Sequence, residues 1–120
     1  MKKCLVVDDV EVSLFSAKKA ITSLGMEFSS AGTPEEAMRA LRKGNYDVVL
    51  LDWHLRKRSG IDLLRTIRAE YGSKFRVIIF SGVEGAEKVS EAMAAGADAF
   101  LEKPTTPEKV EKCMRDLKIL

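Results

Sequence analysis

Three unbroken tetrads of apolar residues, separated by amphipathic segments, constrain the fold of this chain more than any other feature. The tetrads are Cys4–Val7, Val48–Leu51 and Val77–Phe80. Runs this short and this apolar are typical of parallel strands that are covered on both faces. Two further strands are expected at the edges of the sheet, because Met26–Ala31 alternates in polarity and Ala99–Leu101 is short and flanked by charged residues.

Five segments with helical periodicity alternate with these strands. The first is followed by Gly25, a residue that commonly ends helices. At the start of the second, Thr33 and Glu36 have the spacing of a capping box, and Pro34 suits the first helical position. The other three are expected from about Ile61 to Tyr71, from about Glu84 to Ala95, and from Thr106-Pro107-Glu108 onward.

Alternating strands and helices predict an α/β fold, with a parallel sheet covered by helices on both faces. We expect a single doubly wound domain over residues 1–120, because this length fits one compact unit. The pattern does not determine the strand order. We therefore adopt 2-1-3-4-5, the order of flavodoxin-like folds.

The composition excludes several classes of function. The sequence has 20 basic and 18 acidic residues, so its net charge gives no support for binding nucleic acid or a membrane. The apolar run at the start of the chain stops at Asp8, too early for a secretory signal, and we expect a cytoplasmic protein. Cys4 and Cys113 lie in apolar stretches and are expected to be reduced thiols within the core.

Polar residues follow the predicted strands at their carboxyl ends. Asp8 and Asp9 follow the first strand, Asp52 the third, Ser81 the fourth and Lys103 the fifth. In open α/β sheets, the ligand site lies at this edge of the sheet, where the strand order reverses. The sequence therefore predicts that these five side chains converge on one crevice.

The chemistry of this set favours phosphoryl transfer. Three carboxylates in one crevice repel one another and need a cation or a proton. Hard oxygen ligands suit Mg²⁺. They suit zinc poorly, because His54 is the one histidine of the sequence and neither cysteine is near these residues. A carboxylate can attack phosphorus, and Mg²⁺ and the Lys103 ammonium would offset the charge that develops. Each residue alone could be a helix cap or a loop residue; their joint occurrence favours the functional interpretation.

Several segments together resemble the receiver domain of two-component response regulators, as found in the single-domain chemotaxis regulators. They are Val6-Val7-Asp8-Asp9, Asp47–Asp52, Ser81-Gly82, Ala95–Leu101 and Lys103-Pro104. The resemblance covers essentially the whole chain and implies one receiver domain over residues 1–120, with no output domain. It implies that Asp52 accepts a phosphoryl group from a sensor histidine kinase or a phosphotransfer protein. It also implies a Mg²⁺ site formed by Asp8, Asp9, Asp52 and the backbone carbonyl of His54.

The resemblance also implies a switch. Ser81 and Lys103 would contact the phosphoryl group, and the peptide bond before Pro104 would be cis. Phosphorylation would draw Ser81 inward and let Phe100 rotate, which would change the face of the fourth helix, fifth strand and fifth helix for a downstream target protein. Core packing is the alternative role of Phe100. The oligomeric state that we expect is a monomer or a weak dimer.

The chain departs from the common family pattern near the site. His54 and Val83 occupy positions that tune dephosphorylation in the family, and Arg56 and Ser59 replace a frequent proline and aspartate. The basic run Arg56-Lys57-Arg58 is either a solvated loop or an attractive surface for an acidic partner or phosphodonor.

Three other functions stay open at this point. A phosphatase of the haloacid-dehalogenase type would need a second acid two residues after Asp52, where His54 stands. A flavin-binding electron carrier would need hydroxyl and glycine residues where Val10-Glu11-Val12 stands. A pseudo-receiver that only binds proteins would not need the complete set of phosphorylation residues. The pathway, whether chemotaxis, a phosphorelay or the cell cycle, is not determined by the sequence.

Overall fold

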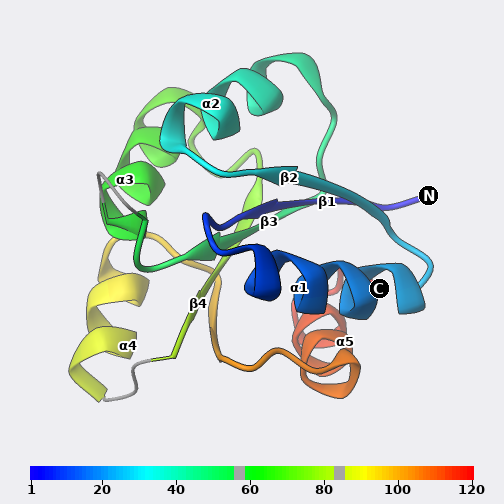
Figure 1. The fold of residues 1–120 in the computed structure, drawn as a ribbon. Helices are drawn as coiled ribbons and strands as arrows, with labels where there is room; N and C mark the ends of the chain where they lie inside the picture. Colours follow the sequence, from blue (N-terminus) through cyan, green and yellow to red (C-terminus); the bar gives the residue numbers. More distant parts are fainter. Residues whose placement is uncertain (56–58, 83–85) are drawn as a thin grey trace.

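The computed structural model describes residues 1–55, 59–82 and 86–120. It contains one parallel sheet with the strand order β2-β1-β3-β4-β5, which confirms the adopted order. Strands and helices alternate along the chain (Figure 1). In order they are β1 (Lys3–Val7), α1 (Glu11–Ser23), β2 (Glu27–Ala31), α2 (Pro34–Lys43), β3 (Val48–Asp52), α3 (Gly60–Tyr71), β4 (Arg76–Ser81), α4 (Ala86–Ala94), β5 (Ala99–Glu102) and α5 (Pro107–Asp116).

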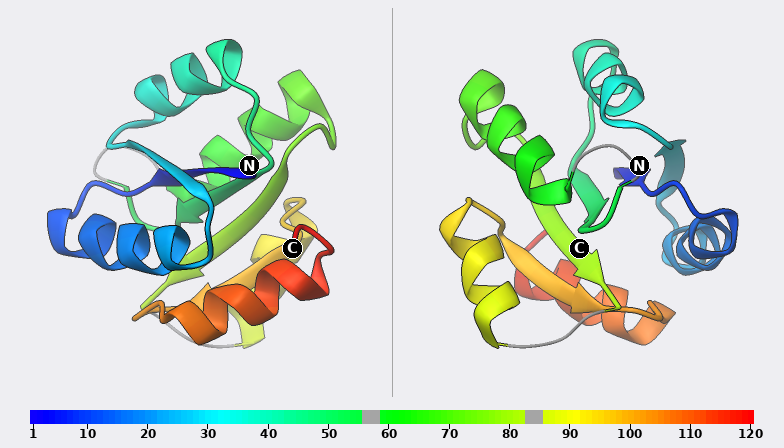
Figure 2. Two further views of the ribbon diagram at one scale, coloured as in Figure 1. Left: turned by 90° about the vertical axis from the view of Figure 1, so that its right-hand side faces the viewer. Right: turned by 60° about the vertical axis from the view of Figure 1, so that its left-hand side comes forward.

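Helices cover both faces of the sheet, and α1 and α5 lie side by side on one of them (Figures 1 and 2). Successive residues of a strand point to opposite faces, so each apolar tetrad supplies two hydrophobic clusters. One cluster packs under α2, α3 and α4 and includes Leu5, Val7, Val49, Leu51, Val77 and Ile79. The other packs under α1 and α5 and includes Cys4, Val6, Val48, Leu50, Ile78 and Phe80.

The helix starts follow the sequence signals, with one difference. Thr33 accepts a hydrogen bond from the Glu36 backbone N–H at 3.1 Å, as expected for an N-cap. The Glu36 carboxylate, however, accepts from the backbone N–H of Gly32 at 3.1 Å. The expected capping box is therefore incomplete, because the return bond is made one residue before the cap.

Most predicted element bounds agree with the structure to within one or two residues. The start of the fourth helix was expected near Glu84, which lies outside the described residues; within them α4 begins at Ala86. Cys4 and Cys113 are free and buried, as expected. No helix in the described part of the chain is long and apolar enough to cross a membrane.

Candidate functional site

The candidate site lies where β1, β3, β4 and β5 end. Backbone hydrogen bonds continue the sheet just beyond the strands and hold these loops in place. Asp8 N–H donates to Ala31 O at 3.0 Å, and Lys103 N–H donates to Ser81 O at 2.9 Å. The residues that begin the loops are thus positioned by the sheet itself.

Three carboxylates meet at this edge of the sheet. One carboxylate oxygen from each of Asp8, Asp9 and Asp52 lies within 4.8 Å of the other two. Asp8 is fully buried, Asp52 is 4% exposed and Asp9 is half-buried. The backbone N–H of Val10 donates to Asp8 Oδ1 at 3.0 Å and fixes the orientation of that carboxylate. Segments far apart in the sequence therefore form one acidic cluster, as the sequence predicts.

The Lys103 ammonium lies against this cluster. Its Nζ is 3.1 Å from Asp8 Oδ2 and 3.4 Å from Asp52 Oδ1. It also lies 4.7 Å from the centre of the Phe80 ring, within the range of a cation–π contact. Among these described groups, one ammonium faces three carboxylates, so a full set of ionised carboxylates leaves an excess of negative charge.

The pKa of Asp52 reflects this excess. It is raised from 3.8 to about 6, first by burial and then by the negative charge of Asp8. The Lys103 ammonium and the backbone N–H of His54, 3.4 Å from Asp52 Oδ1, act in the opposite direction. Burial and carboxylate repulsion outweigh both, so the ionised cluster is held at a cost in free energy.

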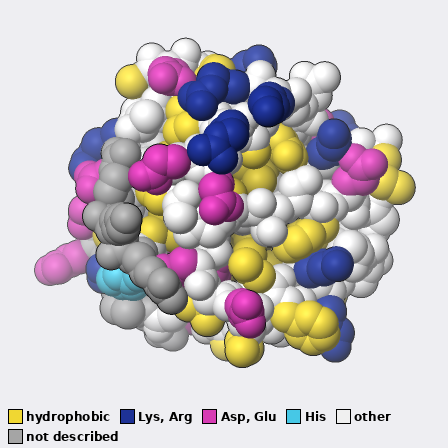
Figure 3. Space-filling view, turned by 45° about the horizontal axis from the view of Figure 1, so that its top comes forward, with side chains coloured by type: hydrophobic (Ala, Val, Ile, Leu, Met, Phe, Trp, Pro, Cys, Tyr) yellow, Lys and Arg dark blue, Asp and Glu magenta, His cyan; other side chains and the backbone are white. Residues whose placement is uncertain are grey.

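The donor set fits Mg²⁺. It consists of closely spaced carboxylate oxygens, the hard ligands that this ion prefers. A divalent cation would also neutralise the excess negative charge that raises the pKa of Asp52. The side chain of His54 is exposed, and the one histidine of the sequence appears as the cyan side chain at the surface in Figure 3. That the backbone carbonyl of His54 is a metal ligand stays a prediction.

The residues assigned to the switch lie on β4 and β5, the two strands that follow β3 in the sheet. Ser81 is buried at the end of β4. Phe100 on β5 is half-buried, and its ring meets that of Trp53 edge to face at a centroid distance of 6.5 Å. The Lys103–Pro104 peptide bond is cis, as the resemblance implies. Val83, expected to tune dephosphorylation, lies outside the described residues, as does the basic run 56–58.

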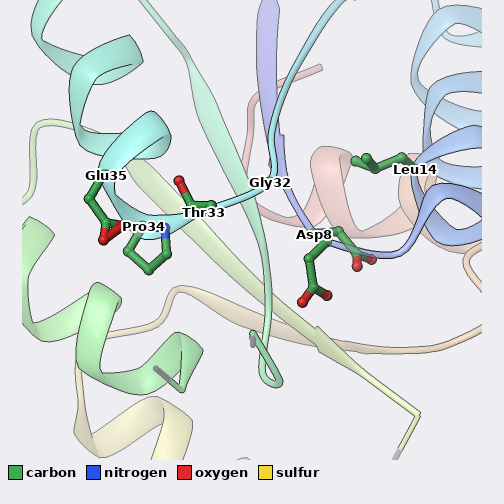
Figure 4. Close-up of a pocket in the computed structure, with 7 residues that line it drawn as sticks. Asp8, Leu14, Gly32, Thr33, Pro34 and Glu35 are labelled. Atoms are coloured by element: carbon green, nitrogen blue, oxygen red, sulfur yellow. The ribbon is translucent and has the colours of Figure 1, made fainter. Parts of the chain in front are cut away.

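A pocket of about 560 Å³ opens next to the cluster, and Asp8 and Asp9 are part of its lining. Figure 4 shows it between Leu14 of α1 on one side and Pro34 and Glu35 of α2 on the other, with Asp8 at its wall. Nothing in the sequence pattern indicated this pocket.

Two residues of the site were not recognised from the sequence. A Cβ at Gly60 would overlap the backbone of Asp52, and the Gly60 N–H donates to Trp53 O at 2.6 Å. Ser13 of α1 accepts a hydrogen bond from Lys103 Nζ at 3.2 Å. From the sequence, Gly60 was only the last residue of the loop before the helix expected at Ile61, and Ser13 belonged to no motif. Both contacts depend on the tertiary fold.

The chain is similar over nearly its whole length to known proteins. The family model of the response regulator receiver domain matches residues 4–115. The chain is 32% identical over 123 residues to the chemotaxis protein CheY-3 of Vibrio cholerae, covering 96% of this chain and 93% of that protein. It is also 32% identical to the chemotaxis protein CheY of Pseudomonas aeruginosa, covering 92% and 94%. The crystal structure of Vibrio cholerae CheY4 matches with a TM-score of 0.88 at 26% identity, covering 97% of this chain and 98% of that one.

Proposed function

Because the chain belongs to the family of response regulator receiver domains, we propose that it is a phosphorylation switch that accepts a phosphoryl group on Asp52. The observation that carries this proposal is the acidic cluster with its single ammonium. Asp8, Asp9 and Asp52 come from separate segments yet place oxygens within 4.8 Å of one another, and Lys103 contacts two of them. Such an arrangement is costly for folding, so a role in chemistry explains it better than a role in stability.

Asp52 is the phosphoacceptor in this proposal. Both oxygens of the fully buried Asp8 are already engaged, one by Val10 N–H and the other by Lys103. An oxygen of Asp52 attacks the phosphorus, and the new O–P bond forms as the bond to the donor breaks and the donor leaves with that electron pair. The donor is a phosphohistidine of a sensor kinase or phosphotransfer protein, or a small acyl phosphate.

The surrounding residues stabilise the transferred group. Asp8, Asp9 and Asp52 would hold Mg²⁺, which supplies positive charge to offset that of the phosphoryl oxygens. The Lys103 ammonium, within reach of Asp52, donates to a phosphoryl oxygen as the charge develops. The buried Ser81 hydroxyl lies at the end of β4, the strand next to β3, and donates a further hydrogen bond.

The change at Asp52 is passed to a partner through β5 and α4. Trp53 adjoins Asp52 and meets the ring of Phe100, so a shift at the acceptor has a direct contact to β5. On α4, Val89 and Met93 are 38% and 45% exposed, apolar surface that a downstream protein can cover. We also predict that residues 1–120 act as one receiver unit. We expect this unit to be a monomer or a weak dimer in the cytoplasm.

The test is the mass of the intact protein after incubation with acetyl phosphate and Mg²⁺. The wild-type chain should gain the mass of one phosphoryl group, and Asp52→Asn should not. Asp47→Asn is the matched control, because Asp47 lies at the other end of β3, where it accepts from Lys3 N–H at 2.8 Å; this variant should be labelled like the wild type. Equal labelling of Asp52→Asn, or none in the wild type, would contradict the proposal.

A further inference from the structure

The Lys103 ammonium is held by three oxygen atoms. Its Nζ lies 3.1 Å from Asp8 Oδ2, 3.2 Å from Ser13 Oγ and 3.4 Å from Asp52 Oδ1. An ammonium carries three N–H donors, so these three acceptors match its full capacity. The contacts come from the loop after β1, from the first turn of α1 and from the end of β3, so Lys103 joins three separate elements.

Ser13 differs from the other two acceptors because it is neutral. Asp8 and Asp52 are also members of the acidic cluster that fits a divalent cation. A cation bound there would compete with the ammonium for the same carboxylates and would weaken two of the three contacts of Lys103. The bond from the ammonium to a neutral hydroxyl is not subject to that competition.

The place of Ser13 suits such a role. It is half-buried and shares a groove of about 270 Å³ with the Lys103 side chain, Ser16 and Phe80. The Phe80 ring also lies 4.7 Å from Nζ. The ammonium therefore has support that does not depend on the carboxylates.

From these contacts we propose that Ser13 is a positioning residue, which keeps the Lys103 ammonium beside Asp52 when Asp8 and Asp52 bind a divalent cation. The inference rests on the proposed phosphorylation of Asp52 and adds a residue that sets its rate. Ser13 acts through Lys103 and touches neither the metal nor the phosphoryl group. Since Ser13 is half-buried, water replaces part of its hydrogen bond, and its removal slows phosphorylation by about five- to tenfold rather than abolishing it.

The test compares phosphorylation rates of Ser13→Ala, Ser13→Thr and Ser16→Ala with acetyl phosphate at saturating Mg²⁺. Ser13→Ala should be about five- to tenfold slower. Ser13→Thr keeps the hydroxyl and should restore most of the rate. Ser16→Ala is the matched control in the same helix and groove and should leave the rate unchanged. Mg²⁺ affinity, read from Trp53 fluorescence, should change less than about twofold in Ser13→Ala, because Ser13 is not a ligand.

A double-mutant cycle separates positioning from a general structural effect. In a Lys103→Met background, Ser13→Ala should have no further effect on the residual rate, because its route of action is gone. An equal slowing in both backgrounds, or a wild-type rate in Ser13→Ala when the wild type is labelled, would overturn the role of Ser13 alone. A wild-type chain that is never labelled would overturn the proposed function and this inference together.

Discussion

The ammonium of Lys103 lies 3.4 Å from the carboxylate of Asp52, yet the pKa of that carboxyl group is raised to about 6. The ion pair therefore does not compensate for the burial of Asp52 and its closeness to Asp8. In the absence of a metal, the site destabilises the folded protein at neutral pH. A cation that binds these carboxylates would relieve this destabilisation, so its binding can be measured as an increase in the free energy of unfolding.

The first prediction concerns stability and pH without Mg²⁺. The pKa of Asp52 rises from 3.8 in its ordinary state to about 6 in the folded protein, so folding is favoured by protonation of Asp52. The contribution is fully present below about pH 4 and is lost as the pH rises through about 6. Asp52→Asn has no carboxyl group to ionise and therefore does not lose this stability. The difference in free energy of unfolding between the variant and the wild type should increase by about 2–3 kcal/mol in favour of the variant from pH 4 to pH 7, as measured by urea denaturation. A difference that stays constant over this range would contradict the shift.

The second prediction concerns the metal. Mg²⁺ should raise the urea midpoint of the wild type at pH 7, and a chelator should reverse the rise, because the three carboxylates would hold the ion together only in the folded protein. Asp9→Asn should weaken Mg²⁺ binding by about tenfold or more, since it removes a charged ligand. Glu35→Gln is the matched control, because Glu35 lines the same pocket but is not part of the cluster. Equal losses in both variants would show that only diffuse negative charge attracts the ion.

The third prediction concerns Gly60. A Cβ there would overlap the carbonyl oxygen of Asp52, so Gly60→Ala must displace the backbone that carries the acceptor. We expect a loss of about 1–3 kcal/mol in the free energy of unfolding, together with slower phosphorylation. Gly32→Ala is the control, because a Cβ at Gly32 meets no atom within 4 Å. If the two variants are equally stable, the close packing of α3 against β3 is not required.

The fourth prediction concerns Trp53, the single tryptophan of the sequence. The residue is 5% exposed. Its ring contacts the Lys88 ammonium, 4.3 Å from the ring centre, and the ring of Phe100. Both Mg²⁺ and phosphorylation should change its emission. Phe100→Ala should reduce the change caused by phosphorylation but keep the change caused by Mg²⁺, because only the former is expected to move β5. A phosphorylation response that survives intact in Phe100→Ala would leave Phe100 with a packing role alone.

The sequence was sufficient to predict the elements of the fold and four residues that meet at the site, Asp8, Asp9, Asp52 and Lys103. The apolar tetrads located the central strands, and the polar residues after them located the acidic cluster. The strand order could not be derived, because hydrophobic periodicity carries no information about which strands are neighbours. The contacts of Gly60 and Ser13 were also missed, since each depends on how a helix packs against a distant strand end.

The return bond of Glu36 shows the same limit on a smaller scale. The spacing of Thr33 and Glu36 correctly predicted the N-cap, but the Glu36 carboxylate accepts from the Gly32 N–H instead of the Thr33 N–H. A motif fixes which groups are able to pair, whereas the backbone path decides which of them meet.

The central claim is that three convergent carboxylates make one of their number, Asp52, the phosphoacceptor. The most direct test is borohydride reduction of the protein after incubation with acetyl phosphate, because this converts an aspartyl phosphate into homoserine, which peptide mapping locates. We predict homoserine at residue 52 when Mg²⁺ is present and none when a chelator has removed it. Homoserine at residue 8 or 9, or equal labelling with and without Mg²⁺, would contradict the account.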